Sequence, residues 1–224
     1  MSIPKIIHQI WIGPDPIPKK YQYFIQMMKD MHPDWQHILW DNDMVFNGIF
    51  AEDEYLKGVK AKIGSEYLMQ PAFVADRVRL LILDKMGGIY VDADAKPIRS
   101  FNEVISKVSK DCKIFAGLKN DTEYGLMADV TVLGATPNNH HLKHIISRWH
   151  DGMYNHPLSG LHISRELLRI VDWDITLFKK EYFYNEFITS ETIILHETDD
   201  RAYSWQSMRP EWVDDEETDT EEDI

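Results

Sequence analysis

The stretch from Pro71 to Asp94 constrains the fold of this chain more than any other part of the sequence. It begins with PAFVADRVRLLILDKM, and because proline suits the first helical turn, the pattern predicts a helix over residues 71–86. Gly87 suits the left-handed position that commonly follows a helix end. The apolar run Ile89–Val91 then predicts a short strand. A helix that turns directly into a strand is typical of layered α/β folds.

The rest of the chain continues this alternation. Strands are predicted over Lys5–Ile12, Trp35–Trp40, Ile114–Gly117, Asp129–Leu133 and the apolar run Thr192–Leu195. Helices are predicted over Lys19–Met31, 49–69, His141–Tyr154 and His162–Val171. Such an order predicts a mostly parallel central sheet flanked by helices. The 224 residues suffice for one domain of this class, which we expect residues 1–210 to form.

The negative charge of the chain is concentrated at its end. The formal net charge is −13, and residues 211–224 (EWVDDEETDTEEDI) contain acidic side chains and no Lys or Arg. This composition predicts a solvated, disordered acidic tail. The remainder of the chain is close to neutral and lacks the basic surface of a nucleic-acid binder, so we expect no nucleic acid among its partners.

Cysteine content and hydropathy indicate the compartment. The single cysteine, Cys112, fits a reducing environment. The N-terminal segment is apolar, but His8 and Gln9 interrupt it, so it resembles a first core strand more than a signal peptide. No apolar run approaches the length of a transmembrane helix. We therefore expect a soluble, cytoplasmic protein without a transmembrane segment.

Two aspartates, Asp92 and Asp94, follow the predicted strand with one residue between them. Because side chains alternate along a strand, we expect both carboxylates on the same side. Two carboxylates at such a short distance repel each other unless a cation or a proton lies between them. Oxygen ligands suit Mg²⁺ or Mn²⁺, and ligands of open α/β sheets bind beyond the carboxyl ends of the strands. The pair indicates a metal site, although the same short pattern also occurs in polar turns.

A phosphohydrolase is an alternative interpretation of this pair. In one class of Mg²⁺-dependent phosphohydrolases a strand ends in the same pattern, and the first carboxylate, here Asp92, is the nucleophile. That motif usually lies on the first strand with Thr or Val after it. Here it comes about ninety residues into the chain and is followed by Ala95-Lys96.

Asp76 and Arg79 share one face of the predicted helix, and the Gly87-Gly88 turn returns the chain beside it. The stretch VADRVRLLILDKMGGIYVDAD resembles the sugar-nucleotide motif of the DXD glycosyltransferases, and IPKIIHQIWIG resembles that family's opening strand. The family includes the yeast initiating α-mannosyltransferase, bacterial capsule enzymes and, more distantly, the clostridial glucosylating toxins. The resemblance covers residues 3–100 and is thin afterwards. Many members have Asn near the position of Asp129, a difference that concerns the acceptor side.

This resemblance implies a GT-A fold and an enzyme of glycan or polysaccharide biosynthesis. Such an enzyme transfers a hexose, with retention of configuration, from a UDP- or GDP-sugar donor to a hydroxyl acceptor. Asp94 would coordinate Mn²⁺ or Mg²⁺, and Asp92 would contact the ion and the ribose. Asp76 and Arg79 would hold the sugar hydroxyls and the diphosphate. A simple ion pair within the helix is the alternative for these last two residues. The implied mechanism needs no dedicated base.

Three further residues are candidates for donor binding. Trp11 lies where the first predicted strand ends, and there it could stack on the base of the nucleotide or pack in the core. Ser204 and Trp205 resemble the closing Ser-Trp pair that the family places near the diphosphate.

His196 follows the last predicted strand and is a candidate third metal ligand, with a hydrogen-bonded core histidine as the alternative. His140, His141 and His144 could form a metal-binding face, but we expect them to be exposed helix residues. A non-catalytic module that binds a nucleotide sugar is a further alternative for the whole protein.

Overall fold

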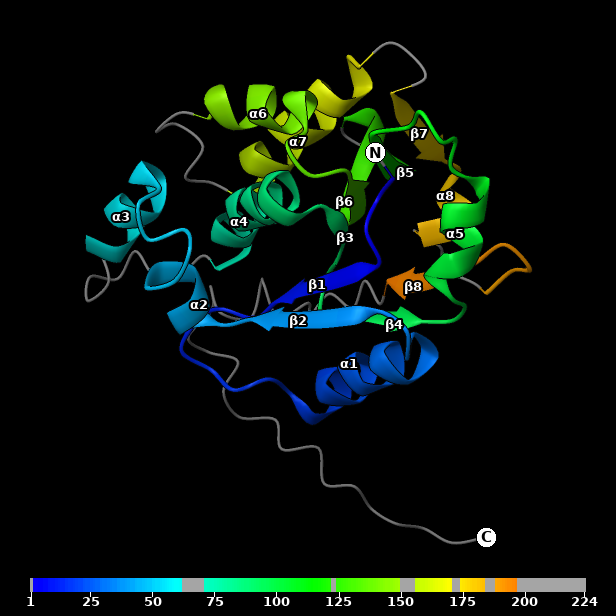
Figure 1. The fold of residues 1–224 in the computed structure, drawn as a ribbon, viewed down its shortest axis with the longest axis horizontal. Helices are drawn as coiled ribbons and strands as arrows, with labels where there is room; N and C mark the ends of the chain where they lie inside the picture. Colours follow the sequence, from blue (N-terminus) through cyan, green and yellow to red (C-terminus); the bar gives the residue numbers. More distant parts are fainter. Residues whose placement is uncertain are drawn as a thin grey trace, which may run out of the picture.

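The computed structural model describes residues 2–61, 71–121, 124–149, 156–170, 174–183 and 188–196. Its centre is a six-stranded sheet with the order β2-β1-β3-β6-β5-β7 (Figure 1). These strands are β1 (Ile6–Ile10), β2 (Gln36–Trp40), β3 (Gly88–Val91), β5 (Ile114–Asp121), β6 (Gly125–Ala135) and β7 (Ile175–Phe178). A second sheet pairs β4 (Ala95–Pro97) antiparallel with β8 (Ile194–His196).

Five of the six strands in the central sheet run in one direction. β1 pairs parallel with β2 and with β3, and β5 pairs parallel with β7. Among these strands β6 alone runs the other way, antiparallel to β3 and β5. The mostly parallel α/β sheet predicted from the sequence is therefore confirmed. The C-terminal ends of β1, β2 and β3 meet at one end of the sheet, and the starts of β5 and β7 lie at the other.

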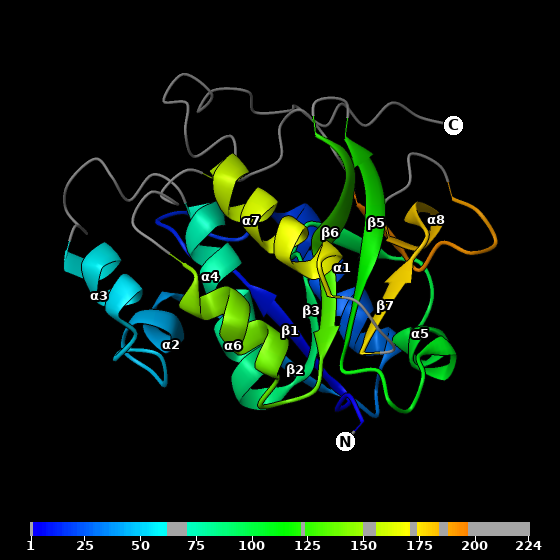
Figure 2. The same cartoon turned by 90° about the horizontal axis from the view of Figure 1, so that it is seen from above.

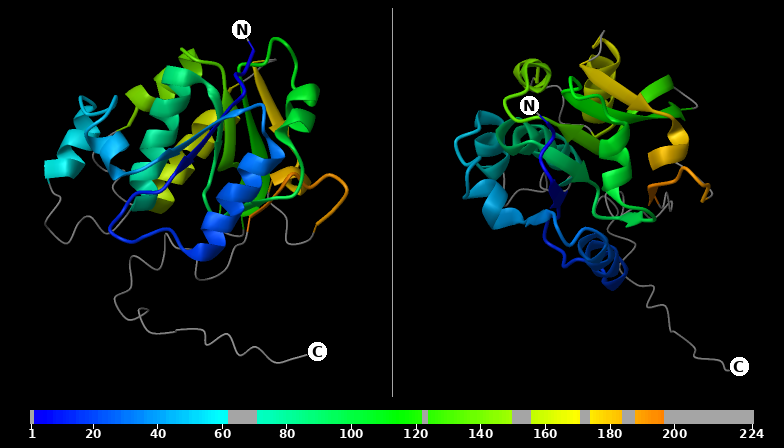
Figure 3. Two further views of the ribbon diagram at one scale, coloured as in Figure 1. Left: turned by 60° about the horizontal axis from the view of Figure 1, so that its bottom comes forward. Right: turned by 45° about the vertical axis from the view of Figure 1, so that its right-hand side comes forward.

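Helices cover both faces of this sheet (Figures 2 and 3). They are α1 (Lys19–Met31), α2 (Asn42–Phe46), α3 (Glu54–Ala61), α4 (Pro71–Met86), α5 (Phe101–Lys107), α6 (His140–Ser147), α7 (His156–Leu168) and α8 (Lys180–Phe183). One core lies between the sheet and α4, α6 and α7, and a second lies between the sheet and α1, α5 and α8. Along β3, Tyr90 belongs to the first core and its neighbours Ile89 and Val91 to the second, as strand alternation requires.

The two predictions with the clearest end signals are confirmed. The helices predicted over 19–31 and 71–86 have the same bounds in the structure. Gly87 has φ of 66°, and its N–H donates to the Leu83 carbonyl at 2.9 Å. A Cβ at this position would lie 2.6 Å from Pro137 Cδ, so both the backbone conformation and the space require glycine.

Several predicted bounds were wrong. α7 begins at His156 rather than at residue 162, because Pro157 is tolerated in a first helical turn. β5 and β6 are longer than the predicted strands, because residues 117–121 of β5 pair with residues 125–129 of β6 as a hairpin. For the helix predicted over 141–154, the structure has α6, which ends at Ser147 with Arg148 as its C-cap residue.

Other short elements were not predicted at all. These are α2, α5 and α8 among the helices and β4 and β7 among the strands. Of the helix predicted over 49–69, α3 covers residues 54–61, and residues 62–70 lie outside the described part of the chain.

Some predictions cannot be compared with the structure. Ser204, Trp205 and the acidic tail 211–224 lie outside the described residues, as does the side chain of His196, whose backbone belongs to β8. The division into a domain over 1–210 and a tail therefore stays a prediction. Within the described residues, no helix has the length and apolar character needed to span a membrane.

Candidate functional site

Arg79 connects the helix to the end of β3. α4 packs against β3 and directs the guanidinium toward Asp92. Arg79 Nη2 lies 2.8 Å from Asp76 Oδ1, and Nη1 lies 3.4 Å from Asp92 Oδ1. The side chains of Asp76 and Arg79 are only 1% and 5% exposed, whereas that of Asp92 is 24% exposed. The ion pair within the helix is thus one part of a larger cluster that reaches solvent at Asp92.

The backbone and an aromatic ring hold this guanidinium in place. Nη1 of Arg79 donates to the Val130 carbonyl at 2.6 Å, and the guanidinium lies 4.3 Å from the centre of the Tyr90 ring. Burial disfavours the charged form, but the carboxylates of Asp76, Asp92 and Asp129 outweigh that cost and raise the pKa of Arg79 above its ordinary value. Arg79 is therefore a fixed positive charge at every accessible pH.

Tyr90 orients Asp92. The two residues are two positions apart at the end of β3, and the Tyr90 hydroxyl donates to Asp92 Oδ1 at 2.6 Å. Burial raises the pKa of Tyr90 well above its ordinary value, so the hydroxyl keeps its proton. The Asp92 N–H donates to the Thr131 carbonyl at 3.0 Å, which anchors the backbone to β6. Asp92 is consequently fixed at both its main chain and its side chain.

Asp129 adds a third carboxylate beside Arg79. It lies on β6 where the register with β5 shifts, and its side chain is 1% exposed. Its Oδ1 accepts hydrogen bonds from the N–H and the hydroxyl of Thr131, at 3.2 and 3.1 Å. Lys119 Nζ lies 3.8 Å from the same oxygen. Asp129 is one of the carboxylates that raise the pKa of Arg79.

Ser159 holds Asp76 from the opposite side. It lies on α7, is completely buried, and donates from its hydroxyl to Asp76 Oδ2 at 2.5 Å. Asp76 is therefore bonded to Arg79 through one oxygen and to Ser159 through the other. This hydrogen bond joins helices α4 and α7, although Asp76 and Ser159 are far apart in the sequence.

The aspartate pair occupies a turn rather than a strand. β3 ends at Val91, and the Ala95 N–H donates to the Asp92 carbonyl at 3.2 Å. Strand alternation therefore does not apply to Asp92 and Asp94, and their placement on the same side stays a prediction. Immediately after this turn, the backbone of Ala95 pairs with that of His196.

These residues have an excess of negative charge. We call Asp76, Arg79, Asp92 and Asp129 the acidic edge of the sheet. Three carboxylates there face one guanidinium and the ammonium of Lys119, and the adjacent turn brings the carboxylate of Asp94. Oxygen donors with a surplus of negative charge fit a hard divalent cation such as Mg²⁺ or Mn²⁺.

Trp11 follows β1 at the same end of the sheet. Its N–H donates to the Trp40 carbonyl at 2.8 Å, and its indole Nε1 donates to the Asp15 carbonyl at 3.0 Å. The indole ring lies 6.0 Å from the ring of Tyr21 and stays partly exposed. Trp11 thus packs on one side against Tyr21 and stays open to solvent on another, and its contact with a base stays a prediction.

The structure brings three of the predicted residues into direct contact, Asp76, Arg79 and Asp92. Sequence reasoning missed Tyr90, Asp129 and Ser159, which hold or surround them. The spacing of Tyr90 two residues before Asp92 was an available signal. Ser159 comes from a distant helix and left no signal in the sequence.

The mostly parallel sheet, with helices on both faces and an acidic turn after its third strand in sequence, is a GT-A type fold. Residues 18–110 match the family described as the glycosyltransferase sugar-binding region containing a DXD motif. The aspartate turn lies within this matched segment.

Two curated relatives come from Saccharomyces cerevisiae. The mannosyl phosphorylinositol ceramide synthase SUR1 is 29% identical over 156 residues, which are 60% of this chain and 39% of the relative. The corresponding synthase CSH1 is 32% identical over 155 residues, which are 66% of this chain and 37% of the relative. The chain thus spans less than two fifths of the length of either synthase.

A solved structure supports the fold independently. The PaToxG glycosyltransferase superimposes with a TM-score of 0.55 at 21% sequence identity, covering 75% of this chain and 69% of that one. At such low identity the likeness concerns the fold alone.

Proposed function

We propose that this protein is a metal-dependent, retaining glycosyltransferase that moves a hexose from a nucleoside-diphosphate sugar to a hydroxyl group of a glycan or other acceptor. The observation that carries the proposal is the position of Arg79, which contacts Asp76 and Asp92 at once inside the matched family segment. A fixed cation beside acidic oxygens can accommodate both a metal ion and a diphosphate.

Asp92 and Asp94 would hold the divalent ion. Asp76 and Asp129 are almost completely buried, so the surplus negative charge can be met from outside only at the partly exposed turn. A bound Mn²⁺ or Mg²⁺ supplies neutralisation of the charge that grows on the departing diphosphate. His196 would be a third ligand, because its backbone pairs with Ala95, the residue after Asp94.

Arg79 and Asp76 would act because the protein holds them in place before the donor binds. Arg79 is held by Val130 and Tyr90, so its charge can act on the diphosphate without moving. Asp76, oriented by Ser159, would hold Arg79 in place. Because its side chain is only 1% exposed, the predicted contact with the sugar hydroxyls would require donor binding to uncover it. Preorganised charges of this kind need little reorganisation during the reaction, which is where they contribute most to catalysis.

The choice of donor rests on the names of the yeast relatives. The names of the two yeast relatives specify a mannosyl group, so GDP-mannose is the first donor to test and UDP-sugars are the second. We extend no particular acceptor to this chain. Trp11 would contact the base, and Ser204 and Trp205 would lie near the diphosphate. The cytoplasmic location stays a prediction.

The test measures release of GDP or UDP from the corresponding sugar donors in the presence of Mn²⁺ or Mg²⁺. We expect Asp92→Asn and Asp94→Asn each to lower turnover at least about a hundredfold (roughly 2.7 kcal/mol), because Asn keeps the size and loses the charge. Asp174→Asn is the matched control, since it removes a carboxylate at the opposite end of the sheet. Melting temperatures of all three variants should stay close to that of the wild type.

Other outcomes would favour the alternative functions. Near wild-type turnover by both Asp92→Asn and Asp94→Asn would contradict the metal site. A phosphorylated Asp92 trapped with a phosphate ester would instead indicate the phosphohydrolase. Donor binding without release of nucleotide from any donor would indicate a non-catalytic binding module.

A further inference from the structure

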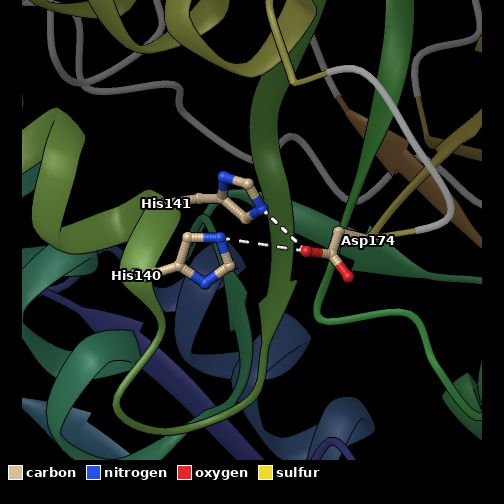
Figure 4. A group of neighbouring side chains, drawn as sticks. All are labelled: His140, His141 and Asp174. Atoms are coloured by element: carbon tan, nitrogen blue, oxygen red, sulfur yellow. Dashed lines mark hydrogen bonds and ion pairs between the residues drawn. The ribbon is translucent and has the colours of Figure 1, made fainter.

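A second group of metal-ligating side chains lies far from the acidic edge. His140 and His141 begin α6, and Asp174 directly precedes β7. We call these three residues the histidine cluster (Figure 4). The first residue of β7, Ile175, pairs with Ile114, and Ile114 pairs with Ala135, which also faces the first residue of β3. The cluster therefore lies at the end of the sheet opposite the aspartate turn.

The three side chains converge on one point. Nε2 of His141 lies 3.2 Å and Nε2 of His140 lies 3.8 Å from Asp174 Oδ2. One ligand atom from each residue can be chosen so that all lie within 4.8 Å of one another. In a tetrahedral Zn²⁺ site with bonds of about 2.0–2.1 Å, ligand atoms are about 3.3–3.5 Å apart. The two distances to Asp174 Oδ2 are close to that spacing, and the two imidazoles, whose ligand atoms lie within 4.8 Å of each other, would have to reach it as well.

The backbone beneath the cluster is well supported. The side chain of Asn139 accepts hydrogen bonds from the N–H groups of His141 and Leu142, which fixes the start of α6. The same side chain donates to the Lys113 carbonyl at 2.8 Å. The Asp174 carbonyl accepts from the N–H groups of Lys113 and Ile114, at 2.8 and 3.0 Å. Both backbone segments are thus anchored to the same strand entry, so the ligands are held close without a metal.

The protonation states also suit metal binding. Partial burial, with His141 and Lys113 nearby, lowers the pKa of His140. The hydrogen bond from Lys113 lowers the pKa of Asp174, which keeps the carboxylate ionised. Neutral imidazole and ionised carboxylate are the ligand forms that a metal ion requires.

We propose that His140, His141 and Asp174 form a second metal site, which takes a borderline-soft divalent ion such as Zn²⁺ and leaves its fourth position to water. Two imidazoles and one carboxylate suit Zn²⁺, whereas the oxygen donors of the acidic edge suit Mn²⁺ or Mg²⁺. The site would join the start of α6 to the start of β7.

Lys113 competes with a metal ion for Asp174, which gives a direct test of the site. Its Nζ lies 3.0 Å from Asp174 Oδ2, the oxygen that both histidines approach, and its side chain is 44% exposed. A metal ion at the cluster must displace this ammonium from the oxygen or share the carboxylate with it. Removing the ammonium should therefore strengthen metal binding, whereas a carboxylate without a site would show no such effect.

The experiment titrates Zn²⁺ into the full chain by calorimetry, at pH 7 after treatment with a chelator. We expect His140→Ala, His141→Ala and Asp174→Asn each to weaken the tightest Zn²⁺ site at least tenfold, and Lys113→Met to strengthen it severalfold. His144→Ala is the matched control, because His144 lies one turn further along α6, faces Glu166 at 3.6 Å and is 60% exposed. Its affinity should stay within twofold of the wild type.

Co²⁺ provides an independent readout, since a tetrahedral site gives a visible absorption band that should vanish in His141→Ala and persist in Asp92→Asn. Unchanged Zn²⁺ affinity in His141→Ala, or weaker affinity in Lys113→Met, would overturn the proposal. Equal losses in His144→Ala and His141→Ala would do the same, because they would indicate non-specific binding by surface histidines. The variants change partly exposed side chains, so their melting temperatures without metal should match that of the wild type.

Discussion

The acidic edge and the histidine cluster lie at opposite ends of one sheet and treat charge in different ways. At the acidic edge, Asp76 and Arg79 are 1% and 5% exposed, so each charge depends on its protein partners for compensation. In the histidine cluster, His140 is 62% exposed, so water can replace a lost partner. Buried charges that are paired only with other protein groups are costly, so their presence indicates a functional site. Exposed charges that water can solvate cost little, so they do not by themselves indicate one.

The largest effect should follow from removing the charge at the centre of the acidic edge. Arg79→Met leaves the carboxylates of Asp76, Asp92 and Asp129 without their main counter-charge, and we expect a loss of about 3–5 kcal/mol in the free energy of unfolding. Urea denaturation measures this loss. The matched control is Arg148→Met, whose guanidinium is 56% exposed and lies 3.7 Å from Glu166, and which should lose less than about 1 kcal/mol. Similar losses in both variants would remove the contrast between buried and exposed charge.

The next effect compares a buried histidine with the exposed ones. His8 donates from Nε2 to the Gly87 carbonyl and accepts from the Trp40 indole at Nδ1, and burial lowers its pKa from 6.5 to about 4. A histidine with a lowered pKa stabilises the fold fully above the unfolded value. That contribution is lost as pH falls from about 6.5 toward 4 and amounts to roughly 3 kcal/mol.

Urea denaturation between pH 7 and pH 4 measures this loss, and His8→Gln should flatten it. His32 and His37 have lowered pKa values too and contribute with the same sign, so the comparison between variant and wild type isolates His8. His144→Gln, at an exposed position, should leave the pH profile unchanged. A profile that His8→Gln does not alter would contradict the role of burial.

The two ends also differ in how far the sequence predicts them. At the acidic edge, Asp76, Arg79 and Asp92 fall within one helix-turn-strand segment, so local rules for helix faces and end signals bring them together. The double glycine fixes the turn, and the structure confirms the bounds of the helix. The strand was expected to extend its geometry to Asp92 and Asp94, but it ends at Val91, because a short apolar run does not show where a strand stops and a turn begins.

Local sequence rules of this kind did not predict the histidine cluster. His140 and His141 were expected to be exposed helix residues, and Asp174 lies on an unpredicted strand entry 33 residues after His141. The same limit explains why Ser159 was missed, since its partner Asp76 is 83 residues away. Contacts of this separation depend on how helices pack over the sheet, which residue spacing does not encode.

A smaller effect tests whether α7 supports the acidic edge. Ser159→Ala removes the hydroxyl that donates to Asp76 Oδ2, and a hydrogen bond to a buried charge contributes about 1.5–3 kcal/mol. We expect a loss at the lower end of this range in urea denaturation, together with weaker binding of the sugar donor. Ser147→Ala is the control, because that hydroxyl donates to a helix carbonyl at an exposed site. Equal losses would show that Ser159 contributes no more than a surface serine.

The smallest effect should occur in the histidine cluster without metal. Asp174→Asn removes the ion pair with Lys113, whose side chain is 44% exposed, so we expect the free energy of unfolding to change by less than about 1 kcal/mol. High salt should shrink even this difference, because it screens exposed charges and leaves the buried contacts of Arg79 largely intact. Urea denaturation of Asp174→Asn and Arg79→Met at low and high salt measures both. A large, salt-independent loss in Asp174→Asn would mean that the histidine cluster is as essential to the fold as the acidic edge.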